Sequence, residues 1–181
     1  TVSSISRQSG VPVWKIIYDN QLGEEGKLTV GQALLLLKPQ ESAEIREDLY
    51  VTGYAYPFIE PYVLEMAFPA LNELLVFSYG FTFEGELVPP IQDETWMIQL
   101  AWENGIEPML VLTPFTQGVF NNQLIQTLVE EESVRENVIT NLLKVVEEKG
   151  YVGVDVDFEY VRAQNREGYA EFVGELRAAM N

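Results

Sequence analysis

Three acidic side chains alternate with apolar ones over a short stretch of the sequence. Asp155, Asp157 and Glu159 stand at odd positions, while the even positions 152, 154, 156 and 158 hold three valines and a phenylalanine. A period of two is that of a β-strand, so the three carboxyl groups share one face, about 6.5 to 7 Å apart between alternate residues. Three like charges this close do not all ionise easily, so at least one carboxyl is expected to keep its proton near neutral pH, as a general acid requires.

The sequence contains neither histidine nor cysteine, and this excludes several kinds of active site. Pairs of serine or cysteine with histidine need an imidazole base, and the usual zinc sites need imidazole or thiolate ligands. No Gly-x-Gly-x-x-Gly or Gly-Lys-Ser/Thr loop follows an expected strand, so a phosphate cradle for a nucleotide is not expected. Carboxylate chemistry remains, and we expect neither a cofactor nor a resident metal ion.

Two other interpretations of the acidic stretch stay open. One is a strand whose acidic face simply meets solvent, although a parallel strand flanked by helices has no such face. The other is a divalent-cation site, because carboxylate oxygens suit magnesium or calcium. Outside the stretch, only Glu60 and Glu84 come near the ends of neighbouring expected strands as further acidic ligands. This scarcity favours acid catalysis over metal binding.

Charge and length restrict the partners of the chain. Its 181 residues carry 28 acidic and 11 basic side chains, a formal net charge of -17, which repels phosphate backbones and anionic lipid headgroups. We therefore expect no nucleic-acid partner. Apolar stretches such as 33–37 and 74–77 are far shorter than the roughly 20 residues of a membrane-spanning helix, so no membrane span is predicted.

From Leu49 onward, apolar strand-like runs alternate with helical patterns, which is typical of parallel βα units. The expected strands are Leu49–Tyr56, Leu74–Phe81, Pro108–Thr116 and Tyr151–Glu159. The expected helices are Tyr62–Ala67, Asp93–Asn104, Ser133–Lys149 and a last one from about Asn165. Four such units make an α/β fold that is either the first half of a (β/α)8 TIM barrel or part of an open doubly wound sheet. The missing nucleotide loop favours the half-barrel over residues 49–181.

Local signals mark the ends of two of these helices. Asp93 is a capping residue for the second helix, and Gly105 can take the left-handed conformation that ends it. Ser133 and Glu136 have the spacing of a capping box, and Gly150 stands where the third helix should stop. These signals predict well-bounded helices.

Residues 1–38 differ in character from the rest, and the polar segment 39–48 that follows is expected to be a linker. The sequence predicts two short helices, Val2–Ser9 and Pro12–Tyr18, and a strand, Leu28–Leu37. The stretches 1–6, 11–13, 16–20 and 28–34 resemble a LysM module, a small unit that binds peptidoglycan and chitin.

The LysM resemblance implies a glycan-binding groove near Asn20 and Leu22. The first strand of such a module would precede Thr1 and is missing, so the predicted strand Leu28–Leu37 has no partner for its backbone groups. The alternative is a helical appendage that packs on the larger domain.

At the acidic stretch, a second family resemblance becomes specific. Residues 153–161 read Gly-Val-Asp-Val-Asp-Phe-Glu-Tyr-Val and resemble the Asp-x-x-Asp-x-Asp-x-Glu signature of family 18 glycoside hydrolases. The form is similar to the spore-germination and cortex-lytic branch of that family, as are the segments 53–57 and 108–113. Two departures argue against a typical chitinase: Val152 replaces the first aspartate of the signature, and Thr113-Pro114 stands where many chitinases have Ser-x-Gly-Gly.

The family 18 resemblance implies a role for each carboxyl group. Glu159 would protonate the glycosidic oxygen. Asp157 would orient the substrate's N-acetyl group, whose carbonyl oxygen attacks the anomeric carbon in place of a protein nucleophile. Asp155 would share a proton with Asp157 and adjust its charge during the reaction.

Aromatic residues near the expected strand ends are candidates for stacking on sugar rings. They are Tyr56, Tyr79, Phe81 and Tyr160. The alternative for each is an ordinary place in the hydrophobic core, since aromatic side chains fill cores as readily as binding sites.

The two resemblances imply a hydrolase of β-linked N-acetylglucosamine polymers, with peptidoglycan or chitin oligomers as the polysaccharide partner and an extracellular, cell-wall or spore-envelope location. Because a closed barrel needs eight strands, we expect the 181-residue chain to have little or no activity by itself and to self-associate through open sheet edges. Two alternatives are a lectin-like protein that binds peptidoglycan or chitin without cutting it, and a structural coat-like protein.

Overall fold

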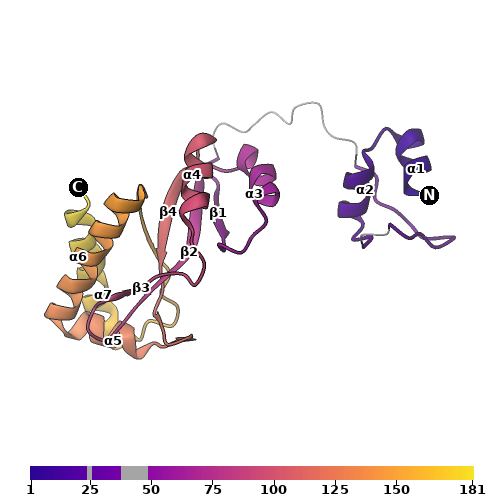
Figure 1. The fold of residues 1–181 in the computed structure, drawn as a ribbon. Coiled ribbons are helices and arrows are strands. Elements are labelled where there is room, and N and C mark those ends of the chain that lie inside the picture. Colours follow the sequence, from indigo (N-terminus) through magenta and orange to yellow (C-terminus); the bar gives the residue numbers. More distant parts are fainter. Residues whose placement is uncertain (24–25, 38–48) are drawn as a thin grey trace. The chain divides into compact units, whose positions relative to one another are not determined.

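The computed structural model describes residues 1–23, 26–37 and 49–181, which fall into two units, Thr1–Asp48 and Leu49–Asn181 (Figure 1). The predicted linker 39–48 lies outside the described residues. Each unit has its own hydrophobic core, so each is described by itself.

The smaller unit contains the two short helices predicted from sequence. Helix α1 spans Val2–Ser9. Thr1 is its N-cap residue, and the Thr1 hydroxyl accepts a hydrogen bond from the backbone N–H of Ser4 at 3.2 Å. It ends at Gly10, which has a φ of 75°. Helix α2 spans Val13–Asp19. The core between them contains Val2, Val11, Ile16 and Leu22.

The predicted strand Leu28–Leu37 is wrong, because the described residues 26–37 contain no strand. Instead, the side-chain amide of Asn20 forms hydrogen bonds with both the N–H and the carbonyl of Leu35. Asn20 Oδ1 accepts from the Leu35 N–H at 2.6 Å, and Asn20 Nδ2 donates to the Leu35 carbonyl at 2.8 Å. A segment without a neighbouring strand cannot form a ladder, and a side-chain amide takes over part of its hydrogen bonding.

The larger unit is built on a parallel sheet, which confirms the predicted α/β class. Its strands lie in the order β1-β2-β4-β7, and every neighbouring pair is parallel. Their bounds are Thr52–Ala55 for β1, Glu73–Phe81 for β2, Glu107–Leu112 for β4 and Gly153–Val156 for β7. A short strand β3, Leu87–Val88, pairs with the end of β2 in the antiparallel sense.

Helices alternate with these strands. They are α3 at Pro61–Ala67 with the 3-10 turn η1 at Phe68–Ala70, α4 at Thr95–Glu103, α5 at Gln123–Glu130, α6 at Glu132–Lys149, and α7 at Arg166–Ala179 after the 3-10 turn η2 at Ala163–Asn165. Helices α5, α6 and α7 contact one another and form one group in Figure 1. Helix α5 was not predicted.

The predicted capping box at Ser133 and Glu136 does not form. Helix α6 begins one residue earlier, at Glu132, and no side chain caps it. The reason is the neighbouring helix α5, which ends at Glu130. Glu131 joins the two helices: its N–H donates to Thr127 of α5, and its carbonyl accepts from the first turn of α6. The predicted stop at Gly150 is present, with a φ of 81°.

A buried carboxylate ties several elements of this core together. Glu94, just before α4, is 1% exposed, and its Oε1 accepts from the Tyr79 hydroxyl at 2.5 Å and from Lys149 Nζ at 2.6 Å. Burial and this carboxylate raise the pKa of Tyr79 well above its ordinary value, so the phenol remains a donor. Strand β2 and the end of α6 are thereby linked to the start of α4.

An irregularity in β2 decides which way its side chains point. The ladder pairs Val76 with Leu110 and then Tyr79 with Leu112, so β2 has one more residue than β4 between these pairs. The Phe77–Ser78 peptide bond in this stretch is cis. Because an extra residue reverses the alternation, Phe77 and Tyr79 face opposite sides of the sheet.

After β4 the chain makes a small hairpin that sequence did not predict. Strand β5, Phe115–Thr116, pairs with β6, Val119–Phe120, around a turn in which Gln117 and Gly118 have positive φ angles of 51° and 81°. The predicted strand Pro108–Thr116 therefore ends at Leu112. No helix in the described part of the chain is long and apolar enough to cross a membrane.

Candidate active site

The acidic segment is held by its apolar residues. Val154, Val156 and Phe158 pack against the core, as the alternating pattern predicts. Phe158 lies beyond the end of β7, and its ring stacks on Phe172 of α7 with centroids 6.1 Å apart and contacts Phe81 at 5.9 Å. The alternation therefore continues past the strand, and the acidic side chains keep to the other side.

Asp155 lies within β7 and is held by a tyrosine from the opposite end of the sheet. The Tyr54 hydroxyl, from β1, donates to Asp155 Oδ2 at 2.8 Å. Burial, followed by this hydrogen bond and the charge of Asp155, raises the pKa of Tyr54 to about 12. Tyr54 is therefore a permanent donor to this carboxylate at neutral pH.

Asp157 follows β7 directly, and its backbone N–H still bonds the carbonyl of Leu112 at 3.0 Å. Partial burial raises the pKa of its carboxyl above the ordinary value, and the neighbouring charges of Asp155 and Glu159 act in the same direction. Asp157 therefore holds a proton more tightly than an isolated aspartate does. This agrees with the expectation that the three carboxyl groups do not all ionise readily.

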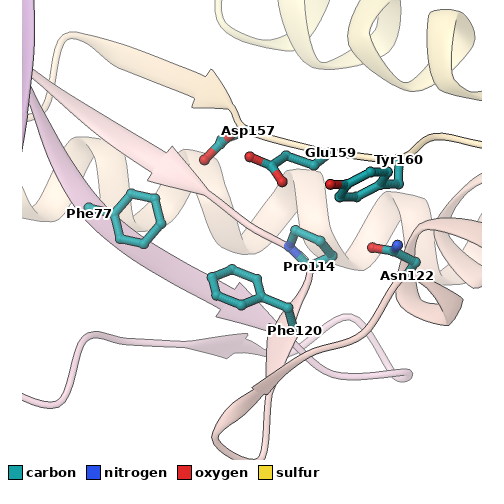
Figure 2. A pocket seen from close by; sticks show the side chains of 7 residues that line it. All are labelled: Phe77, Pro114, Phe120, Asn122, Asp157, Glu159 and Tyr160. Carbon is teal, nitrogen blue, oxygen red and sulfur yellow. The ribbon is translucent and has the colours of Figure 1, made fainter.

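Asp157 and Glu159 line the same cavity, of about 370 Å³. Figure 2 shows both carboxyl groups projecting from the segment after β7 toward the space bounded by aromatic and proline side chains. The cavity is lined by Phe77, Pro114, Phe120, Asn122, Asp157, Glu159 and Tyr160. We call it the carboxylate pocket.

A second cavity of about 360 Å³ shares Phe77 and Phe120 with the carboxylate pocket. Its lining is mostly apolar and contains no charged side chain. The residues are Tyr56, Pro57, Phe58, Phe77, Ser78, Pro89, Pro90, Ile91, Gln92, Phe115 and Phe120. We call it the apolar pocket.

The structure separates the aromatic residues that sequence grouped as candidates for sugar stacking. Tyr160 lines the carboxylate pocket, and Tyr56 lines the apolar pocket, where its ring stacks on Phe58 at 5.0 Å. Tyr79 and Phe81 lie in the core and are 2% and 0% exposed, which corrects their assignment as stacking residues. The extra residue in β2 turns both side chains away from the pockets.

Asn20 and Leu22 belong to the smaller unit and take structural places there. The Asn20 side-chain amide forms three hydrogen bonds, all with backbone atoms. Its Nδ2 donates to the carbonyls of Ile16 and Leu35, and its Oδ1 accepts from the Leu35 N–H. Leu22 is a buried core residue. Their predicted role in a glycan groove has no further support from these contacts.

Several residues of the site were not predicted. Phe77, Phe120 and Asn122 line the carboxylate pocket, and Tyr54 holds Asp155. For Tyr54 a signal existed, because it lies in the segment 53–57 that resembles the cortex-lytic branch. For Phe120 and Asn122 no sequence signal was available, because the hairpin that positions Phe120 was unpredicted.

Within residues 1–23, 26–37 and 49–181, no three carboxylate, histidine or cysteine side chains converge in a way that could hold a metal ion.

Comparison with known proteins gives relatives that act on glycans. The chain is 23% identical over 177 residues to YdhD of Bacillus subtilis (strain 168), which is described as a sporulation-specific glycosylase; the match covers 98% of this chain and 41% of that protein. The crystal structure of the spore cortex-lytic enzyme SleL of Bacillus cereus is 25% identical with a TM-score of 0.65, over 98% of this chain and 41% of SleL. No protein-family model matches.

A class V chitinase structure from Pseudomonas fluorescens shares the fold, with a TM-score of 0.67 at 22% identity over 72% of this chain and 41% of the chitinase. The chain is similar to glycoside hydrolases. It spans 41% of the length of YdhD and of SleL.

Proposed function

We propose that this chain carries the acid end of a glycoside-hydrolase site that cleaves β-linked N-acetylglucosamine polymers. The observation that carries the proposal is the joint position of Asp157 and Glu159 in one cavity, with Asp155 held behind them by Tyr54. Acid catalysis on a glycosidic bond needs one protonated carboxyl and a second group that stabilises the positive charge at the anomeric carbon.

In the proposed reaction, Glu159 gives its proton to the glycosidic oxygen as the bond from that oxygen to the anomeric carbon breaks. The carbonyl oxygen of the substrate's own N-acetyl group bonds to the anomeric carbon, and Asp157 orients this group. Water then attacks the anomeric carbon, the bond from this carbon to the carbonyl oxygen breaks, and the water gives a proton to Glu159, so that two displacements retain the configuration. The raised pKa of Asp157 supports a proton shared with Asp155, while an oxygen of Asp157 accepts from the acetamido N–H and leaves the carbonyl oxygen free to attack.

Asp155 has the role of proton partner to Asp157 in this proposal. Its Oδ2 already accepts from Tyr54, which leaves the other oxygen for a proton shared with its neighbour. Tyr54 compensates part of the negative charge when Asp157 and Asp155 both lose protons.

Peptidoglycan is the proposed natural substrate class, and chitin oligomers are the proposed analogues. The names of the relatives, a sporulation-specific glycosylase and a spore cortex-lytic enzyme, support a place in the cell wall or spore envelope. The fold shared with the chitinase supports a barrel architecture, and the four parallel strands are proposed to be part of an eight-stranded barrel. Residues 1–38 are proposed to be a LysM-like unit.

The test is hydrolysis of a chromogenic N-acetylglucosamine oligomer by the full chain and by Glu159→Gln. We expect slow release of chromophore by the unaltered chain and none by Glu159→Gln, since the amide cannot donate the proton. A matched control is Glu131→Gln, at the junction of α5 and α6 outside both pockets. Equal and measurable rates of hydrolysis by the unaltered chain and Glu159→Gln would contradict the proposal.

A second candidate function is glycan binding without cleavage. The aromatic lining of the apolar pocket favours it, because the apolar faces of sugar rings stack on such side chains. Binding of chitin oligomers that is the same in the unaltered chain and Glu159→Gln, together with no hydrolysis by either, would support this candidate instead.

A further inference from the structure

Phe120 stands between the two pockets and belongs to the lining of both. Its side chain is 62% exposed, so it lies at the surface, between the two pockets. Its ring contacts Phe115 edge to face, with centroids 5.2 Å apart and planes at 66°. Phe77 is the only other described residue that lines both pockets, and Figure 2 shows the two rings on neighbouring sides of the carboxylate pocket.

The hairpin that carries Phe120 is firmly attached at its base. The Asn121 N–H bonds the Pro114 carbonyl at 2.7 Å, and the Thr113 N–H bonds the Tyr79 carbonyl at 2.9 Å. Gly80 allows β5 to lie directly against β2, because a Cβ at this position would be 1.9 Å from the carbonyl oxygen of Phe115. The position of Phe120 is therefore set by backbone contacts.

The two pockets differ in charge. The carboxylate pocket has Asp157 and Glu159 and no basic side chain, and the side chains in the apolar pocket that can form hydrogen bonds, those of Tyr56, Ser78 and Gln92, are all uncharged. An anionic ligand would be repelled by the first and find no cation in the second. A ligand that occupies both must therefore not be anionic, and it must present apolar faces to aromatic rings.

Ring contacts lead from one pocket into the other. Phe77 contacts Tyr56 with centroids 4.8 Å apart, and Tyr56 stacks on Phe58 at 5.0 Å. Each cavity lies in the size range of about 300 to 1,000 Å³ typical of ligand pockets.

We propose that Phe120, together with Phe77, is a specificity-determining residue that selects glycans long enough to pass over it from the carboxylate pocket into the apolar pocket. The occupant is an N-acetylated oligosaccharide that carries no anionic group on the sugars in the two pockets, with one sugar beside the carboxyl groups and the next on the Tyr56 and Phe58 rings. This inference rests on the proposed function and adds to it a minimum length of the glycan and the absence of anionic groups on the sugars in the two pockets.

The experiment uses the full chain with Glu159→Gln, so that no hydrolysis disturbs binding, and titrates it calorimetrically with N-acetylglucosamine, its dimer and longer oligomers. We expect affinity to rise from the single sugar to the longer oligomers. Adding Phe120→Ala should lower the affinity for longer oligomers roughly five- to tenfold and leave the single sugar within about twofold, since one aromatic contact is lost only on the far side.

Two matched variants make the test specific. Val119→Ala changes the preceding residue of the same strand, which is 59% exposed and lines neither pocket, and should leave all affinities unchanged. Phe120→Tyr keeps the ring and should restore the length dependence. Circular dichroism of each variant checks that it is folded, and the smaller unit is identical in all of them.

The outcomes separate the two proposals. If Glu159→Gln binds none of the glycans and the unaltered chain cleaves none, the proposed function fails. If affinity rises with length and Phe120→Ala leaves this rise intact, only the inference about Phe120 is overturned. An equal loss for the single sugar and the longer oligomers also overturns it, as does equal binding of a carboxymethylated oligomer.

Discussion

Asp155, Asp157 and Glu159 have three different surroundings although they alternate along one segment. Asp155 accepts a hydrogen bond from Tyr54, Asp157 is partly buried with a raised pKa, and Glu159 is exposed in the carboxylate pocket. A general acid must reach both substrate and water during one reaction, and Glu159 is the most exposed of the three. The environments therefore match the separate roles that we propose.

Tyr54→Phe should slow hydrolysis without changing its pH dependence. The substitution removes the donor to Asp155 and keeps the ring. A hydrogen bond to a charged group contributes about 1.5 to 3 kcal/mol, and since Tyr54 is 56% exposed we expect the lower end, about a tenfold loss in kcat/KM. Because the pKa of Tyr54 is about 12, the phenol is protonated throughout the neutral range, and the loss should be constant there. Rates at several pH values measure it.

Tyr62→Phe is the control for this prediction, because Tyr62 is an exposed tyrosine on α3 outside both pockets. It should hydrolyse the oligomer at the unaltered rate. A loss in Tyr62→Phe equal to that in Tyr54→Phe would show that the hydrogen bond to Asp155 is not the cause.

Asp157→Asn and Asp93→Asn should change stability with opposite signs as pH rises. The folded state raises the pKa of Asp157, so its ionisation destabilises the fold increasingly as pH rises above the ordinary value of 3.8. The folded state lowers the pKa of Asp93, mainly through the Thr95 hydroxyl and then its N–H, so this carboxylate stabilises the fold above 3.8 and loses the effect as pH falls. Relative to the unaltered chain, Asp157→Asn should gain and Asp93→Asn should lose thermal stability between acid and neutral pH.

Calorimetric unfolding temperatures at about pH 3 and pH 7 measure both differences, and a gain of a few degrees is the expected scale for Asp157→Asn. If Asp157→Asn were less stable than the unaltered chain at neutral pH, the partial burial of an ionised Asp157 would not be costly, and the proton-holding role would lose its support.

The types and spacing of the acidic residues were sufficient to predict their common face. The directions of the aromatic side chains could not be predicted in the same way, because Tyr79 and Phe81 follow an extra residue in β2 that reverses the side of the sheet they face. Sequence alternation carries no mark of such a bulge, and a sheet buried on both faces offers no polar side to reveal the reversal.

At the scale of elements, the contact between β5 and β2 predicts a strict need for glycine at position 80. In Gly80→Ala the new Cβ would be 1.9 Å from the Phe115 oxygen and 2.8 Å from its carbonyl carbon, and these backbone atoms cannot rotate away. We expect a loss of about 3 kcal/mol or more in the free energy of unfolding, above the usual cost of overpacking. Urea unfolding measures it.

Gly174→Ala is the matched control. Gly174 lies inside α7, and a Cβ there would have no atom within 4 Å. Alanine in a helix is favoured over glycine by about 0.5 to 1 kcal/mol, so this variant should be more stable than the unaltered chain. Similar stability of the two variants would contradict the close packing of the hairpin on β2.

Most helices and the parallel strands were predictable because their periodicity and end signals are local. The strand Leu28–Leu37 failed for a non-local reason, since a strand depends on a partner and the Asn20 amide occupies the backbone of Leu35 instead. The β5-β6 hairpin was missed because its strands have two residues each, too few for a period to be read.

At the scale of the molecule, β1 and β7 lie at the two ends of the described sheet order, each with one neighbouring strand. Unpaired strand edges favour association with other strands, so concentration-dependent self-association stays a prediction. The net charge of -17 opposes it, and added salt should therefore strengthen association by screening.

Sedimentation velocity at low and high salt measures this association, and hydrogen exchange of the β1 and β7 amides identifies the surface. Protection of these amides at high protein concentration is expected. A monomer at every concentration and salt level would contradict the prediction.

The hydrogen bond between Tyr54 and Asp155 joins residues 101 positions apart in the chain. Contacts of such separation form late, because the intervening strands must first be in place. During synthesis on the ribosome, the growing chain would contain Tyr54 before Asp155, Asp157 and Glu159 have been added. The proposed hydrolytic activity would therefore be absent until β7 has been synthesised and has joined the sheet.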